Sequence, residues 1–188
     1  MNDNLILIID IETTGFLNTG GKICEIGMVS LCKYSGMINV VYDKVINPFI
    51  SDDELSKSWI VSNGYMTLEE INNGVKFEDI KDEIQEIINS YPSGSTAYNN
   101  IFDFGFLESY GISIPNKLFC PMRVATNICR IVGKNGNFKF PKAEEAYNHF
   151  FPDSNYIEKH RGLDDAYHEA RIVSEILKIK REFDREGV

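Results

Sequence analysis

The first part of the chain consists of short apolar runs separated by polar turns, which is typical of strands. Residues 5–9 form a continuous β-favouring run that ends at Asp10. A run without alternation predicts a strand buried on both faces, at the centre of a sheet. Two further β-rich stretches, 23–31 and 37–46, are separated by a turn at 33–36 that contains Ser and Gly. The pattern therefore predicts a three-stranded antiparallel meander.

Further along, apolar residues recur at the three- and four-residue spacing of amphipathic helices. Four isoleucines follow this spacing within 78–90, and a longer stripe runs from Leu163 to about Glu182. Between them, the pattern predicts a brief strand at 96–98, a helix over 101–109, a strand at 118–120, and helices over about 123–132 and 143–151. Together the elements predict an α/β fold with a mixed five-stranded sheet, the meander plus two further strands, flanked by helices.

Size and composition narrow the class of protein. The 188 residues are 43% hydrophobic and 25% charged, which indicates one soluble globular domain over 1–188. The longest apolar run is too short to cross a membrane, and the N-terminus lacks the basic flank of a secretory signal, so we expect a cytoplasmic protein without a membrane partner. Four cysteines without C-x-x-C spacing indicate core residues in a reducing compartment.

The charge distribution limits the kind of nucleic-acid partner. The net charge is −9, but residues 1–116 hold 6 Lys and Arg against 17 Asp and Glu, whereas residues 117–188 hold 13 against 11. Strong non-specific duplex binding requires many cations that neutralise phosphates, and this chain lacks that excess. A protein that binds only a strand end, through metal ions and a few local contacts, remains compatible with the composition.

Two carboxylates stand at the end of the first predicted strand. Asp10 and Glu12 are two positions apart, so in an extended chain both project from one face. Surface acids at a strand end are common, and alone this pair favours that interpretation. Thr13, Thr14 and Gly15 follow directly and offer small side chains and a flexible backbone where a ligand can approach closely.

Two more acidic positions lie far along the chain. Asp103 falls within the predicted helix 101–109, on the side opposite the apolar residues, where an exposed helical acid is the alternative interpretation. Asp165 lies at the start of the last helix, and His160 precedes it on a loop. Here the alternative is that Asp164 caps the helix and His160 is an ordinary surface residue.

Phosphodiester hydrolysis gives a chemical reason to join these residues. The reaction needs a nucleophile formed at neutral pH and stabilisation of the leaving oxygen, and two divalent cations about 3.5–4 Å apart supply both. A set of carboxylates without cysteine suits Mg²⁺ or Mn²⁺. His160, with an ordinary pKa of about 6.5, is the natural general base for the attacking water.

These segments resemble the three motifs of the DnaQ-like, DEDDh-type 3′-5′ exonucleases. The motifs are 9–15 (Ile-Asp-Ile-Glu-Thr-Thr-Gly), 99–107 (Asn-Asn-Ile-Phe-Asp-Phe-Gly-Phe-Leu) and 160–166 (His-Arg-Gly-Leu-Asp-Asp-Ala). Their order and the distance of five positions from His160 to Asp165 match the family, and the resemblance spans roughly 4–180. Three ordered motifs are a strong signal where one is weak.

The resemblance implies a fold, a mechanism and a set of contacts. The fold would be the RNase H-like mixed sheet, and the metal ligands for two ions would be Asp10, Glu12, Asp103 and Asp165. His160 would activate water, and nucleoside 5′-monophosphates would leave from the 3′ end. The residues that would touch the terminal nucleotide are Thr13, Thr14, Gly15, Tyr98, Asn99 and Phe102.

Two positions depart from the family pattern, and both bear on substrate preference. Tyr98 stands where many members have histidine, and residues 63–67 (Asn-Gly-Tyr-Met-Thr) replace a common His-Gly-Ile-Thr. Phe102 either stacks on a terminal base or packs in the core, and its helical spacing favours the core.

The leading hypothesis is a 3′-5′ exonuclease that acts on single-stranded DNA. An exoribonuclease or a nuclease of short oligonucleotides is the alternative within the same chemistry, because DNA and RNA are distinguished by contacts to the 2′-hydroxyl. A non-catalytic binding module with the same fold is the alternative from another class.

Overall fold

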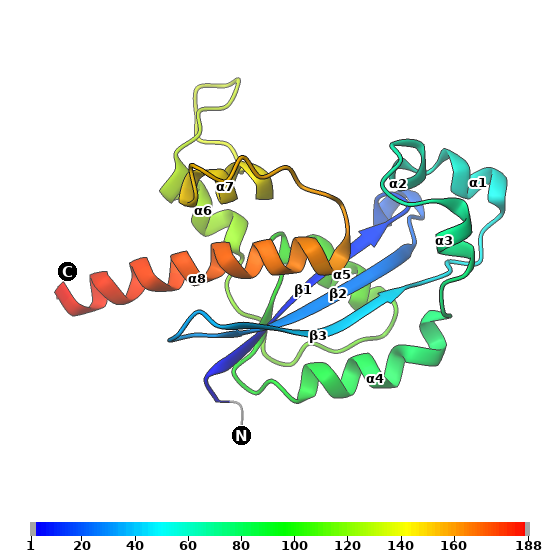
Figure 1. Cartoon of the computed structure of the whole chain (residues 1–188), viewed down its shortest axis with the longest axis horizontal. Coiled ribbons are helices and arrows are strands. Elements are labelled where there is room, and N and C mark those ends of the chain that lie inside the picture. The colour runs from blue at the N-terminus through cyan, green and yellow to red at the C-terminus, as the bar shows by residue number, and fades with distance from the viewer. Residues whose placement is uncertain (1–2, 187–188) are drawn as a thin grey trace.

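A four-stranded sheet in the order β3-β2-β1-β4 forms the centre of the protein (Figure 1). β1 (Leu5–Thr13) and β2 (Ile23–Cys32) pair antiparallel, as do β2 and β3 (Ile38–Val45), which confirms the predicted meander. β4 (Ser95–Thr96) pairs parallel with β1. The computed structural model describes residues 3–186; the remaining positions of the expected 1–188 domain lie outside the described residues.

β1 is buried on both faces, as its continuous apolar run predicts. Leu7 and Ile9 pack in the cluster that includes α4 (Phe77–Asn89) and α5 (Asn100–Ser109). Ile6 and Ile8 project to the other face, where α8 (Gly162–Glu186) covers the sheet. Since successive side chains of a strand alternate, Asp10 and Glu12 belong to the face that α8 covers.

The sheet contains four strands within residues 3–186, so the predicted fifth strand at 118–120 is wrong. β4 is only two residues long, and the segment after it meets the sheet through one isolated bridge between Ser95 and Lys117. The amide of Leu118 donates to the Ser95 carbonyl at 2.9 Å, and Phe119 then turns into side-chain packing. Because β4 has only two residues, it cannot pair with a longer strand at 118–120.

Three short helices that the sequence pattern did not predict occupy the polar stretch after β3. They are α1 (Asp52–Lys57), α2 (Trp59–Ser62) and α3 (Leu68–Asn72). Leu55, Ile60 and Ile71 anchor them in a separate apolar cluster. We call residues 51–73 the support segment. It lies beside the end of the sheet at which β1 finishes (Figure 1).

The remaining helices follow the predicted positions with shifted ends. α7 (Ala143–Phe150) is close to its predicted range, whereas α6 (Pro121–Cys129) ends before the predicted Val132. Arg130 takes a left-handed conformation with φ 51°, which ends the helix, and Val132 instead forms a bridge with Phe138. The one 3-10 helix among the described residues is Leu17–Thr19.

All four cysteines are free, and Cys24 and Cys120 are buried as predicted for core residues, while Cys32 and Cys129 are partly buried. No helix within residues 3–186 has the length and apolar character needed to cross a membrane.

Candidate active site

The end of β1 presents two carboxylates to the face that α8 covers. Asp10 lies opposite Gly27 in the β1–β2 ladder, and Glu12 lies opposite Glu25. Gly27 allows α8 to begin directly on the sheet, because a Cβ atom there would lie 2.1 Å from the backbone carbon of Gly162. The first turn of α8 is thereby brought to the strand that carries Asp10 and Glu12.

Asp103 reaches the same strand end from the first turn of α5. β4 pairs with β1 only at Leu7 and Ile8, so the amide of Ile11 lies beyond that ladder. Asp103 Oδ1 accepts a hydrogen bond from the Ile11 amide at 3.3 Å and is buried. The carboxylate thus lies against β1 between Asp10 and Glu12.

Asp165 lies in the first turn of α8, and only 2% of its surface is exposed. Its Oδ1 accepts from the hydroxyl of Tyr156 at 2.7 Å, and its Oδ2 accepts from the Arg161 amide at 3.0 Å. Both donors come from the loop that leads into α8. His160 belongs to this loop and has a φ of 54°, in the left-handed region that non-glycine residues rarely adopt. The hydrogen bonds to Asp165 therefore hold the loop in the conformation that presents His160.

Residues from all three motifs meet at one cavity of 470 Å³. Asp10, Glu12, Asp103 and His160 line it. Asp165 does not line the cavity, but single ligand atoms of Glu12, His160 and Asp165 lie within 4.8 Å of one another. The structure therefore brings the four predicted acids and the predicted histidine to one place.

Burial and mutual repulsion oppose ionisation of these carboxyl groups. Burial, and next the charge of Glu169, raise the pKa of Asp10 well above its ordinary value. Burial, with the charge of Asp165, raises the pKa of Glu12 to about 9, and burial raises that of Asp103 to about 7. The Oδ2 atom of Asp10 is buried without a hydrogen-bond partner. An uncompensated group of this kind is costly unless a cation neutralises it.

The donor set fits a hard divalent cation. Among the described residues that line the cavity there is no lysine or arginine, while carboxylates come from β1, α5, α8 and the loop before α8. Oxygen ligands are those that Mg²⁺ and Mn²⁺ prefer. The unpartnered oxygen of Asp10 is therefore the kind of ligand that such an ion would use.

Two acidic residues of the cavity were not predicted as site residues. Glu169 is 4% exposed, and its Oε2 accepts from the Tyr98 amide at 3.1 Å. The available signal was its position four residues after Asp165, which places it one turn along the same face of α8. Glu158 also lines the cavity, and burial raises its pKa to about 7. It comes from an irregular loop, where no periodicity indicates it.

The predicted substrate contacts are distributed unevenly around the cavity. Those that line it are Thr13, Gly15, Tyr98, Asn99 and Phe102. Thr14 does not line it, and its hydroxyl oxygen instead accepts from the Lys22 amide at 2.9 Å. The hydroxyl of Tyr98 donates to the Pro141 carbonyl at 2.9 Å, so it ties α7 to the cavity wall.

Aromatic rings form the apolar part of the cavity wall. Phe102 is partly buried, and the centroid of its ring lies 6.4 Å from that of Phe16 in an edge-on arrangement. Phe16 is 68% exposed, so its ring is open to solvent at the cavity mouth. Trp59, from α2, also lines the cavity. The sequence pattern indicated Phe102 but neither Phe16 nor Trp59.

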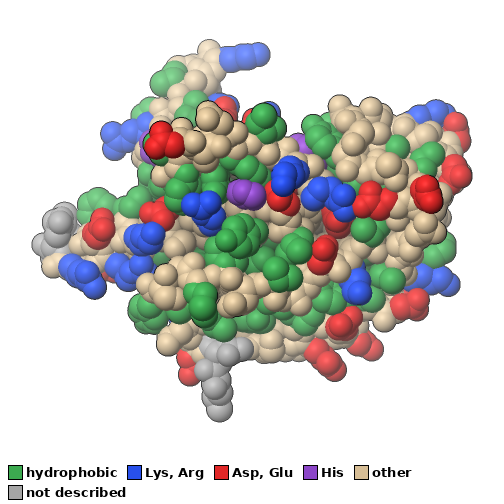
Figure 2. Space-filling model, viewed as in Figure 1, with side chains coloured by type: hydrophobic (Ala, Val, Ile, Leu, Met, Phe, Trp, Pro, Cys, Tyr) green, Lys and Arg blue, Asp and Glu red, His purple; other side chains and the backbone are tan. Residues whose placement is uncertain are grey.

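The surface charge follows the uneven distribution along the chain. Figure 2 shows many acidic side chains around α1, α3 and α4, whereas lysines and arginines lie along the C-terminal part of α8, at the tip of the loop between α6 and α7, in the middle of this face and among the acids on the right. No single basic face of the kind that binds long duplexes is visible in this view.

A family model identifies the family of this chain, and solved structures resemble its fold. A family model described as exonuclease, RNase_T, matches residues 7–173. Among curated proteins, no sequence matches. The solved structures that resemble this chain include a full-length 3′-exonuclease, with a TM-score of 0.69 and 17% identity over 94% of this chain and 61% of that one.

Two further solved structures have similar folds. The nuclease domain of 3′hExo, described as a DEDDh family member bound to rAMP, has a TM-score of 0.69 and 17% identity over 93% of this chain and 92% of that one. E. coli exonuclease I in complex with a dA16 oligonucleotide has a TM-score of 0.67 and 16% identity over 97% of this chain and 42% of that one. At these identities the likeness establishes the RNase H-like fold.

Proposed function

Because this chain belongs to the exonuclease family, we propose that it is a metal-dependent 3′-5′ exonuclease that removes nucleoside 5′-monophosphates from single-stranded DNA. The observation that carries the proposal is the buried, unpartnered oxygen of Asp10 in a cavity where residues of three distant motifs meet. One exonuclease domain over 1–188 accounts for the family match at 7–173.

The proposed metal ligands for two Mg²⁺ or Mn²⁺ ions are Asp10, Glu12, Asp103 and Asp165. When bound, such ions favour formation of the nucleophile and stabilise the leaving 3′ oxygen. Asp10 and Glu12 share one face of β1, so a rigid strand sets their separation. Asp165 is held by donors from its own loop, which keeps its carboxylate directed toward Glu12 and His160.

His160 is the proposed general base. Burial lowers its pKa from the ordinary value of 6.5, so the ring is neutral at pH 7 and a ring nitrogen can accept a proton from the attacking water. The carboxylate of Asp165 acts in the opposite direction on this pKa, and it favours the protonated ring once the proton has moved.

The aromatic wall suits the terminal base of a strand. Phe16 and Phe102 offer ring surfaces at the mouth of the cavity, and stacking on aromatic rings tolerates any base. A cavity of 470 Å³ has the size of a small-ligand site, so it accommodates a strand end and not a paired duplex. Thr13, Gly15 and Asn99 supply polar groups near the same end of β1.

RNA is the second candidate substrate. Two solved structures with nearly equal likeness to this chain carry different ligands: the 3′hExo nuclease domain is bound to rAMP, and exonuclease I is in complex with a dA16 oligonucleotide. Discrimination between the two requires contacts to the 2′-hydroxyl. A non-catalytic module is disfavoured because every ligand candidate and His160 are retained.

The decisive experiment uses matched DNA and RNA oligonucleotides, single-stranded and duplex, labelled separately at each end. With Mg²⁺ or Mn²⁺, a 5′ label should report stepwise shortening, and a 3′ label should be released as a mononucleotide. Asp10→Asn should abolish this activity, whereas Asp82→Asn, a matched change at an exposed position on α4, should retain it. Equal degradation by Asp10→Asn and the unchanged protein would end the proposal, and preferential degradation of RNA would replace DNA as the substrate.

A further inference from the structure

The ring of His160 contacts two aromatic rings as well as the acid cluster. Its ring centroid lies 4.7 Å from that of Trp59 and 4.3 Å from that of Tyr65, and both contacts are edge-on. Trp59 and Tyr65 also contact each other, with centroids 5.0 Å apart. Both belong to the support segment, so the imidazole contacts two rings from another part of the chain.

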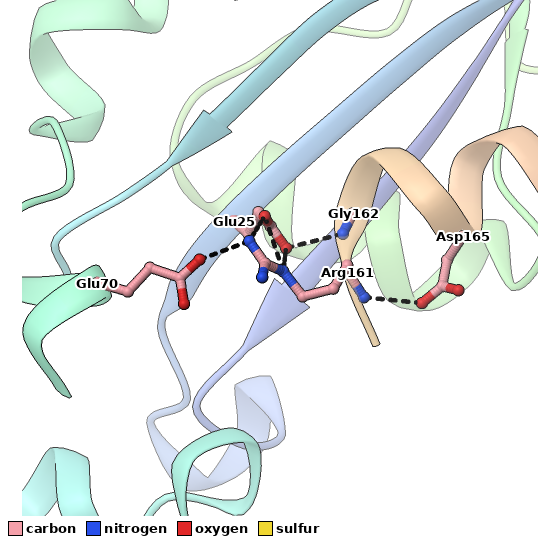
Figure 3. A network of polar contacts seen from close by, with 5 residues as sticks. All are labelled: Glu25, Glu70, Arg161, Gly162 and Asp165. Carbon is pink, nitrogen blue, oxygen red and sulfur yellow. Dashed lines mark hydrogen bonds and ion pairs between the residues drawn. The ribbon is translucent and has the colours of Figure 1, made fainter. Parts of the chain in front are cut away.

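The backbone beside His160 is fixed by a second set of contacts, shown in Figure 3. Arg161 Nη2 donates to Glu25 at 2.8 Å and to Glu70 at 2.6 Å, and Arg161 Nε donates to Glu25 at 3.1 Å. Glu25 Oε2 also accepts from the Gly162 amide at 2.8 Å. Glu25 lies on β2 and Glu70 on α3, so Arg161 joins the sheet to the support segment.

We propose that the support segment positions His160 for proton transfer, with Tyr65 and Trp59 orienting its ring and Arg161 fixing its backbone. This inference rests on the proposed function, because it assigns a purpose to contacts with the proposed base. Tyr65 and Arg161 do not line the cavity, so they act through His160 and are positioning residues.

Ordinary core packing does not account for these rings. The support segment has its own apolar core, whose buried members are Cys24, Leu55, Ile60, Met66 and Ile71. Trp59 is 47% exposed and lies outside that core, and Tyr65 only packs against it from its edge. The left-handed backbone of His160 is a conformation that its surroundings must maintain. The hydrogen bonds to Asp165 hold the loop from one side, and the two rings and the side-chain contacts of Arg161 contribute from the support segment and the sheet.

A double-mutant cycle separates positioning from general destabilisation. Tyr65→Ala should lower kcat about 10- to 100-fold with KM changed less than about threefold, because proton transfer and not binding is impaired. In a His160→Ala background the same change should lower kcat less than about threefold, since no base remains to be positioned. Tyr34→Ala, which removes an exposed ring from the β2–β3 turn, is the matched control.

Glu70→Gln gives a second cycle that leaves all rings and the Glu25 contact in place. It should lower kcat by a smaller factor, about two- to fivefold, and this factor too should disappear in the His160→Ala background. Tyr65→Phe, which keeps the ring, should restore most of the kcat lost in Tyr65→Ala. Equal factors in both backgrounds, or no loss in either cycle, would overturn the inference.

Trp59 provides a readout that is independent of activity. It is the single tryptophan of the chain, so fluorescence excited selectively at tryptophan, and not at the nine tyrosines, reports on the surroundings of this one ring. His160→Ala and Tyr65→Ala should each increase quenching of Trp59 by acrylamide, and Tyr34→Ala should not. Unchanged quenching in both variants would contradict the geometry on which the inference depends. Loss of the proposed function itself would appear separately, as full activity of Asp10→Asn.

Discussion

Glu12 and Glu25 lie opposite each other across the β1–β2 ladder, and both are buried, yet their surroundings differ. Glu25 is paired with Arg161 and also accepts from the Gly162 amide. Glu12 faces Asp165 and other acids, and its pKa is raised to about 9 by burial and by these charges. The Glu25 carboxylate is thus neutralised by a cation of the protein itself, Arg161. The Glu12 carboxylate belongs to a cluster of acids, and no lysine or arginine is among the described residues that line its cavity.

This contrast distinguishes Glu25, whose charge the fold neutralises, from Glu12, a proposed metal ligand, without reference to a motif. Glu25 is buried while its partner Arg161 is partly exposed, so removal of Arg161 should lower the stability of the fold by leaving a buried charge without its cation. A cluster of like charges gains stability when one member is removed. Substitutions that remove a charge should therefore lower the stability of the protein at the Glu25–Arg161 pair and raise it in the acid cluster around Glu12.

The largest effect is expected from Asp10→Asn in the unpaired cluster. Loss of one metal ligand should reduce the rate of oligonucleotide hydrolysis by about 1,000-fold or more, which corresponds to about 4 kcal/mol of transition-state stabilisation. Thermal melting without divalent ions should show equal or higher stability than the unchanged protein. Activity within tenfold of that protein, in a preparation that still binds Mn²⁺ by calorimetry, would exclude Asp10 as a ligand.

Arg161→Met tests the paired region. Because Glu25 would remain buried without a cation, the free energy of unfolding should fall by about 2–3 kcal/mol, less than for a fully buried pair because the Arg161 side chain is 36% exposed and the Gly162 amide still donates to Glu25. For a chain of this size, that loss lowers Tm by roughly 4–12 °C. Lys57→Met is the matched control, since its ion pair with Asp53 is exposed and contributes little. The double variant Arg161→Met with Glu25→Gln should recover part of the loss. If the free energy of unfolding falls equally little in Lys57→Met and Arg161→Met, the ion pair between Glu25 and Arg161 contributes no more to stability than an exposed one.

The acid cluster also predicts how stability without metal depends on pH. Glu12 and Asp103 have pKa values near 9 and 7 in the folded protein, above their ordinary values of 4.5 and 3.8, so the folded state binds more protons than the unfolded state between these limits. The stability that these two groups contribute to the folded state is therefore fully present below about pH 4, and it is lost as pH rises toward 9. In EDTA, Tm should fall by several degrees from pH 5 to pH 9. Saturating Mn²⁺ should remove this fall, and a Tm that rises with pH in EDTA would contradict the electrostatic account.

Local sequence patterns predicted the parts of the fold that carry a clear local signal. β1 was predicted from a continuous apolar run, β2 and β3 from stretches rich in β-favouring residues, and α8 from apolar residues at three- and four-residue spacing. The support segment was not, since helices of four to six residues are too short to show a period. The fifth strand was predicted wrongly because strand propensity at 118–120 carries no information on whether a partner strand is long enough.

The candidate site divides in the same way. Five predicted site residues stand in motifs that can be read directly from the sequence, and the structure brings them together: Asp10, Glu12, Asp103, His160 and Asp165. Glu25 and Trp59 lie in segments without any chemical pattern, so only tertiary contacts identify their relation to His160. Glu169 is intermediate, because its spacing from Asp165 was visible but a helical acid is usually solvated. Only the structure shows that Glu169 is buried and lines the cavity.

Glu169→Gln is expected to have the smallest effect and tests the acid cluster most finely. Glutamine keeps an oxygen that accepts from the Tyr98 amide, so the substitution removes a charge and little else. After burial, the charge of Glu169 is the foremost cause of the raised pKa of Asp10, so its removal should relieve repulsion and raise Tm without metal by no more than about 4 °C. Glu182→Gln, at an exposed position on the same helix, should leave Tm unchanged. Because less repulsion then remains for a cation to relieve, the Tm increase on adding Mn²⁺ should become smaller. A lower metal-free Tm for Glu169→Gln would place Glu169 with Glu25, among the acids whose charge the fold itself requires.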